Sequence, residues 1–199
     1  MPAEGASALW NIQISARASD PASDLPNREI LMFNSGGTGA RPTLDGMSAT
    51  AFPSGVSTMS VEATEHVGPI VVWRKDLREG SGGAGRWRGG LGQVIEIEAR
   101  DGYDFWFNAM FDRVDNPARG RAGGHPGAAG AVELADGTQL NSKGRQLVKG
   151  GQRLRLSLPG GGGYGDPSER ALQDVQRDLE AGFITQHQAV TDYADIYEE

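Results

Sequence analysis

The segment with the clearest chemical potential is the glycine-rich run that begins at Ser81, SGGAGRWRGGLG. It contains Arg86 and Arg88, whose guanidinium groups present forked N–H donors that match carboxylate and phosphate oxygens. The backbone N–H groups around Ser81, Gly82 and Gly83 could add further donors for the same anion. A carboxylate, phosphate or bicarbonate could be held there. The alternative interpretation is structural: the glycines let strands cross closely, and the arginines pair with Asp and Glu.

Glycine is the most unusual part of the composition, with 30 residues in a chain of 199. Its average share in proteins is about 7%, so roughly twice the usual number is present. The glycines gather in four clusters, at 36–39, 81–92, 120–130 and 159–167. Arg, Trp, Leu and Tyr interrupt these clusters irregularly, which flexible Gly/Ser spacers do not show. We therefore expect rigid sites that use positive φ angles or close backbone approach.

Two segments match the dinucleotide-binding pattern G-x-G-x-x-G, at 80–85 and 160–165. The first lacks the buried strand and the following helix that this motif requires. The second lies between a strand-like run and a capped helix, the arrangement that binds phosphate at a helix N-terminus. Too little sequence follows it for the return strand with an acidic ribose ligand, and Asp166 places a negative charge at the phosphate position. A tight structural turn is the favoured interpretation. No G-x-x-x-x-G-K-[ST] motif for an ATP cradle is present.

The three histidines are not spaced as a local metal-binding set. His66 follows two glutamates in the segment 61–65, where a carboxylate pair could couple to it; a solvated surface strand or turn explains these residues equally well. His187 is expected to be exposed on a short helix. His125 lies in a long irregular loop and could approach a ligand.

Composition and charge exclude several classes of protein. The formal charge is −7 and the isoelectric point is near 5, which argues against a nucleic-acid partner. Arginines outnumber lysines sixteen to three, which fits either bidentate anion binding or a codon bias toward Arg. The lack of cysteine excludes disulfides, thiolate zinc sites and a cysteine nucleophile. Neither a signal peptide at the first residues nor an apolar run of membrane-spanning length is visible. We expect a soluble, cytoplasmic protein.

These residues must be positioned by strands, which the hydrophobic pattern predicts over most of the chain. The expected strands are 11–17, 28–34, 69–75, 93–100, 103–111 and 152–158. Strand 69–75 is apolar enough to be buried on both faces, and strand 152–158 places Leu154, Leu156 and Leu158 on one face. Asp101-Gly102 is a hairpin turn signal. Asp136-Gly137, between the short β-like runs 131–135 and 138–140, is a second, weaker one.

The C-terminal part changes to helical periodicity. Asp166-Pro167-Ser168-Glu169 is a capping sequence that predicts a helix from about Pro167. Gly182 fits its end, and Thr185 with Gln188 opens a second short helix through Ala194. The stretch 113–130 shows little periodicity and is expected to be an extended loop. The fold class is therefore α+β: a β-rich domain with long glycine-rich loops and two short C-terminal helices.

Taken in order, the glycine segments resemble the C-terminal part of the hydantoinase B/oxoprolinase family. The matching stretches are GGTGARPTLDG (36–46), SVEATEH (60–66), SGGAGRWRGGLG (81–92), AGGHPGAAG (122–130), NSKG (141–144), PGGGGYGDPSER (159–170) and DVQRDLEAGFITQHQAVTDY (174–193). Each is weak alone, but together they cover nearly the whole chain. The resemblance implies that 1–199 is the C-terminal region of a B-type subunit, with a β-rich part at 1–165 and a helical tail at 166–199.

The resemblance further implies one half of an ATP-dependent enzyme that opens cyclic amides such as hydantoins or 5-oxoproline. A hydantoinase A-type partner would bind ATP and Mg²⁺, which fits the lack of an ATP cradle here. Family members of this type are more than twice as long, so a separate N-terminal portion is expected, and a divalent metal would belong to that portion. No metal ligand can be assigned in this chain.

Within such an assembly, Asp45, Glu62, Glu65 and His125 are the candidate catalytic groups. The run from Ser81 to Arg88 named above would line or brace the cavity that binds the small-molecule substrate. Two alternatives stay open: a fragment of an ATP-dependent ketone carboxylase, or an assembly module without catalytic function whose glycine loops only pack against partners. Neither nucleic acid nor membrane is an expected partner.

Overall fold

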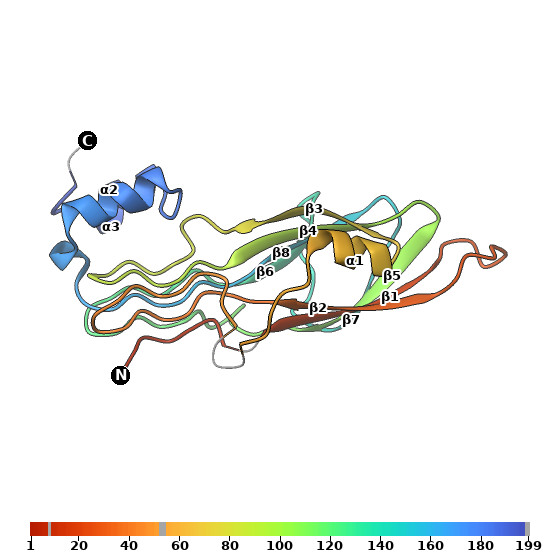
Figure 1. Ribbon diagram of the computed structural model, residues 1–199, viewed down its shortest axis with the longest axis horizontal. Helices are drawn as coiled ribbons and strands as arrows, with labels where there is room; N and C mark the ends of the chain where they lie inside the picture. Colours follow the sequence, from red (N-terminus) through yellow and green to blue (C-terminus); the bar gives the residue numbers. More distant parts are fainter. Residues whose placement is uncertain (8, 52–54, 198–199) are drawn as a thin grey trace.

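The computed structural model describes residues 1–7, 9–51 and 55–197. Two antiparallel sheets form one half of an elongated molecule, and extended segments without regular secondary structure form the other half (Figure 1). Helices α2 (Leu172–Glu180) and α3 (Gln186–Asp192) lie at the end of the molecule that is remote from the sheets. The fold confirms the predicted α+β class with short C-terminal helices.

Each of the two sheets has four strands. The first contains β1 (Trp10–Ala18), β2 (Arg28–Asn34), β5 (Tyr103–Met110) and β7 (Lys143–Val148), in the order β2-β1-β5-β7. The second contains β3 (Ile70–Leu77), β4 (Gln93–Ala99), β6 (Ala131–Leu134) and β8 (Arg153–Ser157), in the order β3-β4-β8-β6. All neighbouring strands pair antiparallel.

The core lies between the two sheets and follows the two-residue alternation of the strands. On β1, Ile12 and Ile14 are fully buried. On the facing sheet, Leu154, Leu156 and Leu158 are fully buried as well, which confirms the predicted face. Each such side chain contributes about 1.5–3 kcal/mol relative to an exposed position. The sandwich therefore supplies the rigid base from which the extended segments leave.

Strand β3 is confirmed in position, but the prediction that it is buried on both faces is wrong. It is an edge strand, and only its first residue, Ile70, is fully buried. The side chain of Trp73 is 56% exposed and covers the guanidinium group of Arg153, whose Cζ lies 4.5 Å from the ring centre. An apolar run cannot by itself distinguish a central strand from an edge strand with stacked side chains.

The turn at Asp101-Gly102 differs from the predicted hairpin. Gly102 has the positive φ of 84° that such a turn requires, but β4 and β5 on its two sides belong to different sheets. The hairpin prediction is wrong because turn chemistry is local, whereas the choice of partner strand depends on distant residues. The hairpin at Asp136-Gly137 is confirmed, since Glu133 and Gln139 form a β-bridge across it.

The extended segments at residues 1–7, 35–51, 78–92, 112–130 and 158–166 hydrogen-bond to one another, and we call them the glycine bundle. Each segment follows or precedes a strand, so the chain passes repeatedly between the sandwich and the bundle (Figure 1). The stretch 113–130 is thus irregular, as predicted, yet it is packed between other segments. Residues 159–165 lie at the centre of the bundle and are called the central segment.

In the central segment, the direction in which the backbone N–H groups point repeats every three residues. The N–H groups of Gly160 and Gly163 both donate to the segment 125–128, whereas those of Gly161 and Gly162 donate to two other segments. A β-strand would repeat after two residues, while a polyproline-II helix has about three residues per turn. The bundle is therefore a stack of polyproline-II-like segments that bond to neighbours on three sides.

Glycine is needed here because neighbouring backbones approach too closely for a side chain. A Cβ atom on Gly160 would overlap the carbonyl of Ser81, and one on Gly161 would overlap that of Thr38. The tight turn predicted over 160–165 is wrong for most of its length, because the chain is extended from Gly160 to Tyr164 and bends only at Gly165, which has φ of 77°. Nor is it a phosphate cradle, since every residue from Gly160 to Gly163 is buried against backbone.

The predicted capping residues are confirmed, but the first helix begins later than predicted. Asp166 caps only a 3-10 turn at Pro167–Glu169, and the chain is extended again at Arg170 before α2 begins. The single helix predicted from Pro167 is therefore wrong in its start. Gly182, with φ of 68°, follows α2 as predicted, and α3 begins with the predicted capping box of Thr185 and Gln188.

Two elements were not predicted from the sequence, strand β7 and helix α1 (Val61–Val67). The strand or turn expected at 61–65 is instead the first part of α1, capped by the hydroxyl of Ser60. This helix contacts the edge strands β2 and β3 of the two sheets. No helix in the described part of the chain is both long and apolar enough to cross a bilayer.

Candidate functional site

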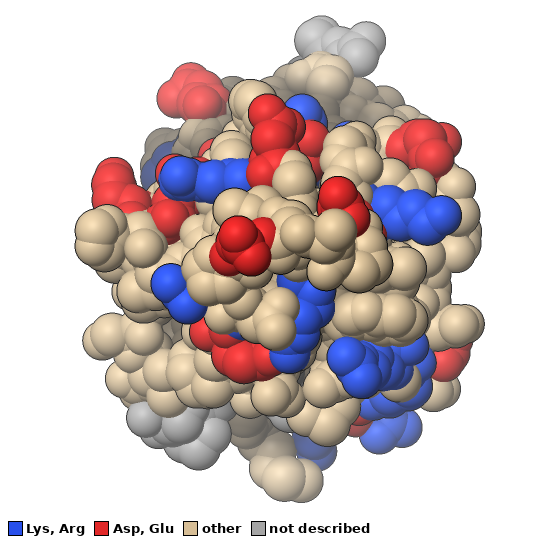
Figure 2. All heavy atoms as spheres, turned by 90° about the vertical axis from the view of Figure 1, so that its right-hand side faces the viewer, with Lys and Arg blue, Asp and Glu red and all other residues tan. Residues whose placement is uncertain are grey.

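The glycine bundle ends in a group of loop tips beside α2, at residues 41–46, 84–88, 119–125 and 164–166, which we call the bundle tip (Figure 1). Backbone hydrogen bonds of 2.9 Å run in both directions between Trp87 and Tyr164. The side chain of Arg86 is 55% exposed there, with Glu169 at 3.4 Å. The opposite end of the molecule carries interspersed acidic and basic side chains (Figure 2).

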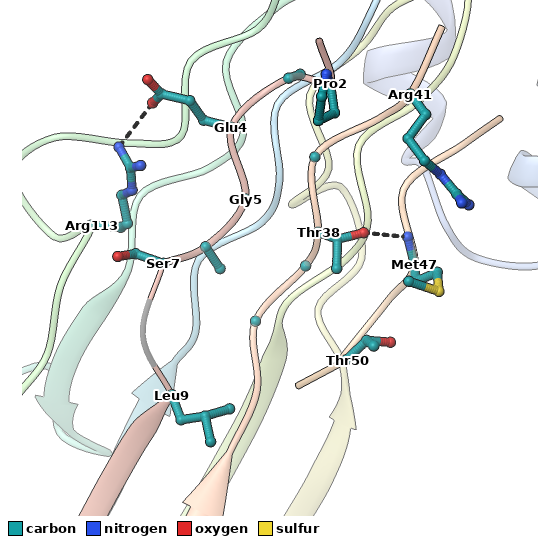
Figure 3. Close-up of a pocket in the computed structure, with 15 residues that line it drawn as sticks. Pro2, Glu4, Gly5, Ser7, Leu9, Thr38, Arg41, Met47, Thr50 and Arg113 are labelled. Atoms are coloured by element: carbon teal, nitrogen blue, oxygen red, sulfur yellow. Dashed lines mark hydrogen bonds and ion pairs between the residues drawn. The ribbon is translucent and has the colours of Figure 1, made fainter. Parts of the chain in front are cut away.

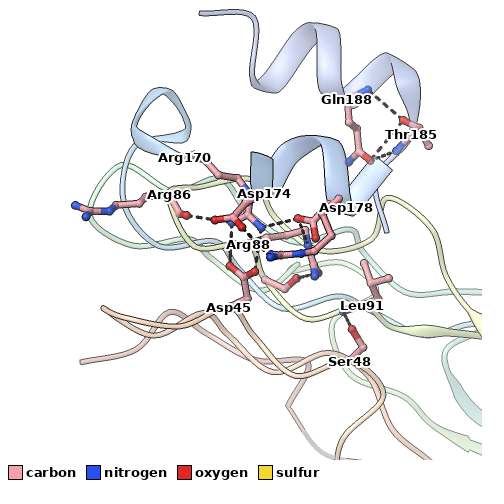
Figure 4. A network of polar contacts seen from close by, with 12 residues as sticks. Asp45, Ser48, Arg86, Arg88, Leu91, Arg170, Asp174, Asp178, Thr185 and Gln188 are labelled. Carbon is pink, nitrogen blue, oxygen red and sulfur yellow. Dashed lines mark hydrogen bonds and ion pairs between the residues drawn. The ribbon is translucent and has the colours of Figure 1, made fainter. Parts of the chain in front are cut away.

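Four charged side chains join the bundle tip to α2: Asp45, Arg88, Arg170 and Asp178 (Figure 4). Arg170 donates to both carboxylate oxygens of Asp45 at 2.9 Å and to Oδ2 of Asp178. Arg88 donates from Nε to Asp178 at 3.0 Å and from Nη1 to the carbonyl of Gly89 at 2.7 Å. The side chains of Arg88, Arg170 and Asp178 are at most 5% exposed. We call this set the buried ion network.

Charge compensation favours the ionised forms of Asp45 and Arg170 despite their burial. For Asp45, burial opposes ionisation most strongly, but the hydrogen bonds and charge of Arg170 outweigh it and hold the pKa of the carboxyl below its usual range. For Arg170, burial lowers the pKa of the guanidinium, and the two aspartates raise it by more. Burial also raises the pKa of the neighbouring Tyr193 hydroxyl to about 12.

The network also fixes the backbone on both sides of Trp87. Arg170 donates to the carbonyl of Arg86 at 3.0 Å, and the N–H of Arg88 donates to Asp45 at 2.7 Å. The exposed guanidinium of Arg86 therefore extends from a backbone that buried charges hold in place. Of the predicted residues, the structure brings Asp45, Arg86 and Arg88 together at this point.

Sequence reasoning missed Arg170 and Asp178, the other half of the network. Asp178 follows the apolar Val175 by three residues, so both lie on the buried face of α2. An acidic residue on the apolar side of a helix is a signal for a buried partner. That partner's identity depends on the tertiary structure.

The predicted backbone donors at Ser81, Gly82 and Gly83 lie inside the bundle and are buried. The hydroxyl of Ser81 donates to the carbonyl of Arg78 at 2.6 Å and accepts from the N–H of Gly92 at 2.9 Å. The N–H of Gly83 donates to the central segment. These groups serve the packing of the bundle and brace the loop that carries the two arginines.

The other predicted catalytic residues lie outside the buried ion network. Glu62 and Glu65 are on α1, on the sandwich half of the molecule (Figure 1). Glu65 accepts a hydrogen bond of 2.7 Å from the N–H of Val72; the pKa of Glu62 is lowered by its own N–H and by Ser60 at the helix start. His125 is half exposed at the bundle tip, with Nδ1 3.6 Å from Asp192.

A groove of about 680 Å³ runs along the side of the bundle (Figure 3). Its floor is formed by glycines of the segments 2–7 and 36–39, and its walls include Leu9, Arg41 and Met47. This volume and this mixture of apolar and polar groups are typical of ligand-binding sites. At one wall, Glu4 is held by Arg119 and Arg113, and hydrogen bonding from Arg119 lowers the pKa of Glu4 to about 2.

Strained backbone is concentrated around this groove. Ser7 and Arg113 line it and have φ angles of 72° and 63°. Ala49, with φ of 47°, lies between two lining residues, Met47 and Thr50. Left-handed backbone at residues other than glycine costs about 1–3 kcal/mol each and clusters at functional sites. Three of the four described non-glycine residues with positive φ therefore lie in or beside this groove.

The described residues do not fit a metal or nucleotide centre. No group of three or more His, Asp or Glu side chains that could hold a metal ion is found among them. The segment that matches a nucleotide pattern is the buried central segment of the bundle. The bundle tip carries the exposed guanidinium of Arg86 and the half-exposed imidazole of His125.

Comparison with known proteins gives a consistent result. The family model for hydantoinase B/oxoprolinase matches residues 1–167. The B component of a putative D-/L-hydantoinase from a Pseudomonas species is 32% identical over 79% of this chain and 28% of its own length. The beta component of the caprolactamase of Pseudomonas jessenii is 31% identical over 80% of this chain and 29% of its own length. The chain therefore spans less than a third of these relatives.

One solved structure extends the comparison to the fold. The crystal structure of the ATP-dependent caprolactamase from Pseudomonas jessenii covers 99% of this chain with a TM-score of 0.78 at 24% identity. This chain covers 36% of that structure. The sandwich, the glycine bundle and the terminal helices thus form an arrangement that recurs within a longer protein.

Proposed function

Since this chain belongs to the hydantoinase B/oxoprolinase family, we propose that it forms the C-terminal region of an ATP-dependent enzyme that opens cyclic amides. Relatives named as components of a hydantoinase and of a caprolactamase support this reaction class. The remainder of the B-type subunit and an A-type subunit are the proposed partners. ATP and Mg²⁺ are assigned to the A-type partner, because the residues described here do not fit them.

The observation that carries the proposal is the exposed Arg86 on a backbone held by the buried ion network. Opening an amide places negative charge on an oxygen atom. A preorganised guanidinium at that oxygen stabilises the charge without reorganising during the reaction. Arg86 is proposed to supply the positive charge that stabilises this oxygen. His125, which also lies at the bundle tip, is proposed to transfer a proton to or from the reacting amide.

The other candidate residues receive supporting roles in this proposal. Asp45 and Arg88 are positioning residues, because their polar groups are used within the network. Asp45 accepts from the N–H of Arg88, and the guanidinium of Arg88 donates to Asp178. The backbone at Ser81–Gly83 braces the same loop. Glu62 and Glu65 are proposed to act from α1 on the part of the enzyme that lies outside this chain. We propose that the region consists of two parts, the β-rich part at 1–165 and the helical tail at 166–199.

The test is turnover of a reconstituted complex of this chain with the remaining B-type portion and the A-type subunit. Arg86→Ala is expected to lower ATP-coupled opening of a lactam or hydantoin at least tenfold in kcat, with Arg86→Lys intermediate. Arg177→Ala, which removes an exposed arginine on α2, is the matched control and should leave turnover unchanged.

Other outcomes assign the function differently. Unchanged turnover in Arg86→Ala would remove the catalytic role. Consumption of ATP that depends on bicarbonate and a ketone would place the chain in a carboxylase instead. Full turnover by the complex without this chain would make it an assembly module.

A further inference from the structure

In two segments of the glycine bundle, one of the three sides carries N–H groups without a described neighbouring segment to accept from them. In the segment 36–41, the N–H groups of Gly37 and Ala40 donate to the central region at Pro159 and Gly162. The N–H groups of Thr38 and Arg41 donate to a second neighbour, the stretch 44–47. The third side of this segment, on which Gly39 lies, faces the groove.

The neighbouring N-terminal segment follows the same rule. The N–H groups of Ala3 and Ala6 donate to the carbonyls of Ala40 and Gly37, and that of Glu4 donates to Arg119. Gly5 occupies the remaining side and also lines the groove (Figure 3).

Gly5 and Gly39 therefore occupy the one position of the repeat at which no neighbouring segment in the described chain accepts from the N–H group, although the carbonyl of Ala3 covers Gly39 on its Cβ side. Neither of their N–H groups has an acceptor among the residues that the structure describes. A Cβ atom on Gly5 would lie 3.4 Å from the nitrogen of Gly39, so the two open positions are adjacent.

We propose that this groove is the docking site for an extended, proline-rich segment of a partner protein that carries an acidic residue. The segment would add to the bundle as one further polyproline-II helix. Its carbonyl oxygens would accept from Gly5 and Gly39, as the carbonyls of other bundle segments do for their neighbours.

Charge and shape select this partner. The guanidinium of Arg41 is exposed on the groove wall, and no carboxylate in the described part of the chain forms an ion pair with it. An acidic side chain on the partner would complete that pair. Leu9 and Met47, which is 41% exposed, provide apolar surface for proline rings.

The conformation of the partner follows from the groove as well. A proline-rich peptide is already in the polyproline-II conformation before it binds, so it loses little entropy, and it needs no acceptor for its missing N–H groups. The strained residues Ser7 and Arg113 border the same surface. The proposal is independent of the reaction assigned above.

The test uses the full chain and a fluorescent peptide of nine L-prolines preceded by aspartate, with fluorescence anisotropy as the readout. Saturable binding is expected, and the same peptide made of D-proline should bind at least tenfold more weakly, because its helix has the opposite hand. A glycine–serine peptide of equal length and charge should be equally weak.

Variants locate the site. Gly5→Ala places its methyl group over the Gly39 nitrogen in ordinary contact, so the chain should keep its fold and lose at least tenfold in affinity. Met47→Ala should weaken binding severalfold, while Met110→Ala, which truncates another exposed methionine away from the groove, should not. Absence of binding, equal binding of the D-proline peptide, or unchanged affinity in both Gly5→Ala and Met47→Ala would overturn the proposal.

Discussion

Asp45 and Arg170 form a two-point contact across 125 residues of sequence, with both oxygens of the carboxylate 2.9 Å from the two terminal nitrogens of the guanidinium. The contact ties a loop of the glycine bundle to the start of the helical tail. Asp178 and Arg88 extend it below the surface. The orientation of the tail and the position of Arg86 therefore depend on the same few charges.

Arg170→Ala should destabilise the protein by about 3–5 kcal/mol, because it leaves the buried carboxylate of Asp178 and that of Asp45 without their main partner. Equilibrium unfolding in urea measures the change in free energy. Arg177→Ala removes an arginine from an exposed pair with Asp174 and should cost at most about 1 kcal/mol. Equal effects in the two variants would show that the network is not a stabilising contact.

Acid should weaken the same contact. The pKa of Asp45 is lower in the folded protein than in the unfolded chain, where an aspartate has a pKa of about 3.9. Its ionisation therefore stabilises the fold above about pH 4, and this contribution is lost as the pH falls through the folded pKa. The difference in unfolding free energy between the wild type and Asp45→Asn should be largest near pH 7 and shrink below pH ~4. A constant difference from pH 7 to 2 would contradict this assignment.

Gly161→Ala should destabilise the glycine bundle, since the added methyl group would overlap the carbonyl of Thr38. Overpacking of this kind costs about 1–3 kcal/mol, occasionally more. Thermal unfolding followed by circular dichroism gives the shift in Tm. Gly5→Ala, whose nearest contact would be 3.4 Å, is the matched substitution and should change Tm by much less. Comparable shifts would mean that the central segment is not closely packed.

Leu156→Ala should cost about 2–5 kcal/mol, because this side chain is fully buried between the two sheets. Leu31→Ala removes a leucine that is 51% exposed on an edge strand and should cost well under half as much. Denaturant unfolding of the two variants tests whether the predicted alternation of β8 defines the core. A larger loss in Leu31→Ala would reverse the inside and outside assignment of these strands.

Much of the sandwich could be predicted because strand signals are local. Alternating apolar residues in 152–158 and the run 28–34 specify a strand and its buried face within a few residues. The capping box of Thr185 and Gln188 specifies a helix start in the same way. The family could likewise be inferred from the sequence, since its glycine motifs follow one another in order along the chain.

Long-range contacts determined the rest. Asp101-Gly102 specifies a turn but not that β4 and β5 enter different sheets. Asp45 and Arg88 could be named as candidates, whereas their partners Arg170 and Asp178 could not. The glycine clusters indicated close backbone approach, but not a stack of segments with a three-residue repeat. The backbone N–H group is chemically the same in every residue except proline, which has none, so the sequence does not specify which distant carbonyl will accept from it. Only the tertiary structure determines which carbonyl accepts from each N–H group.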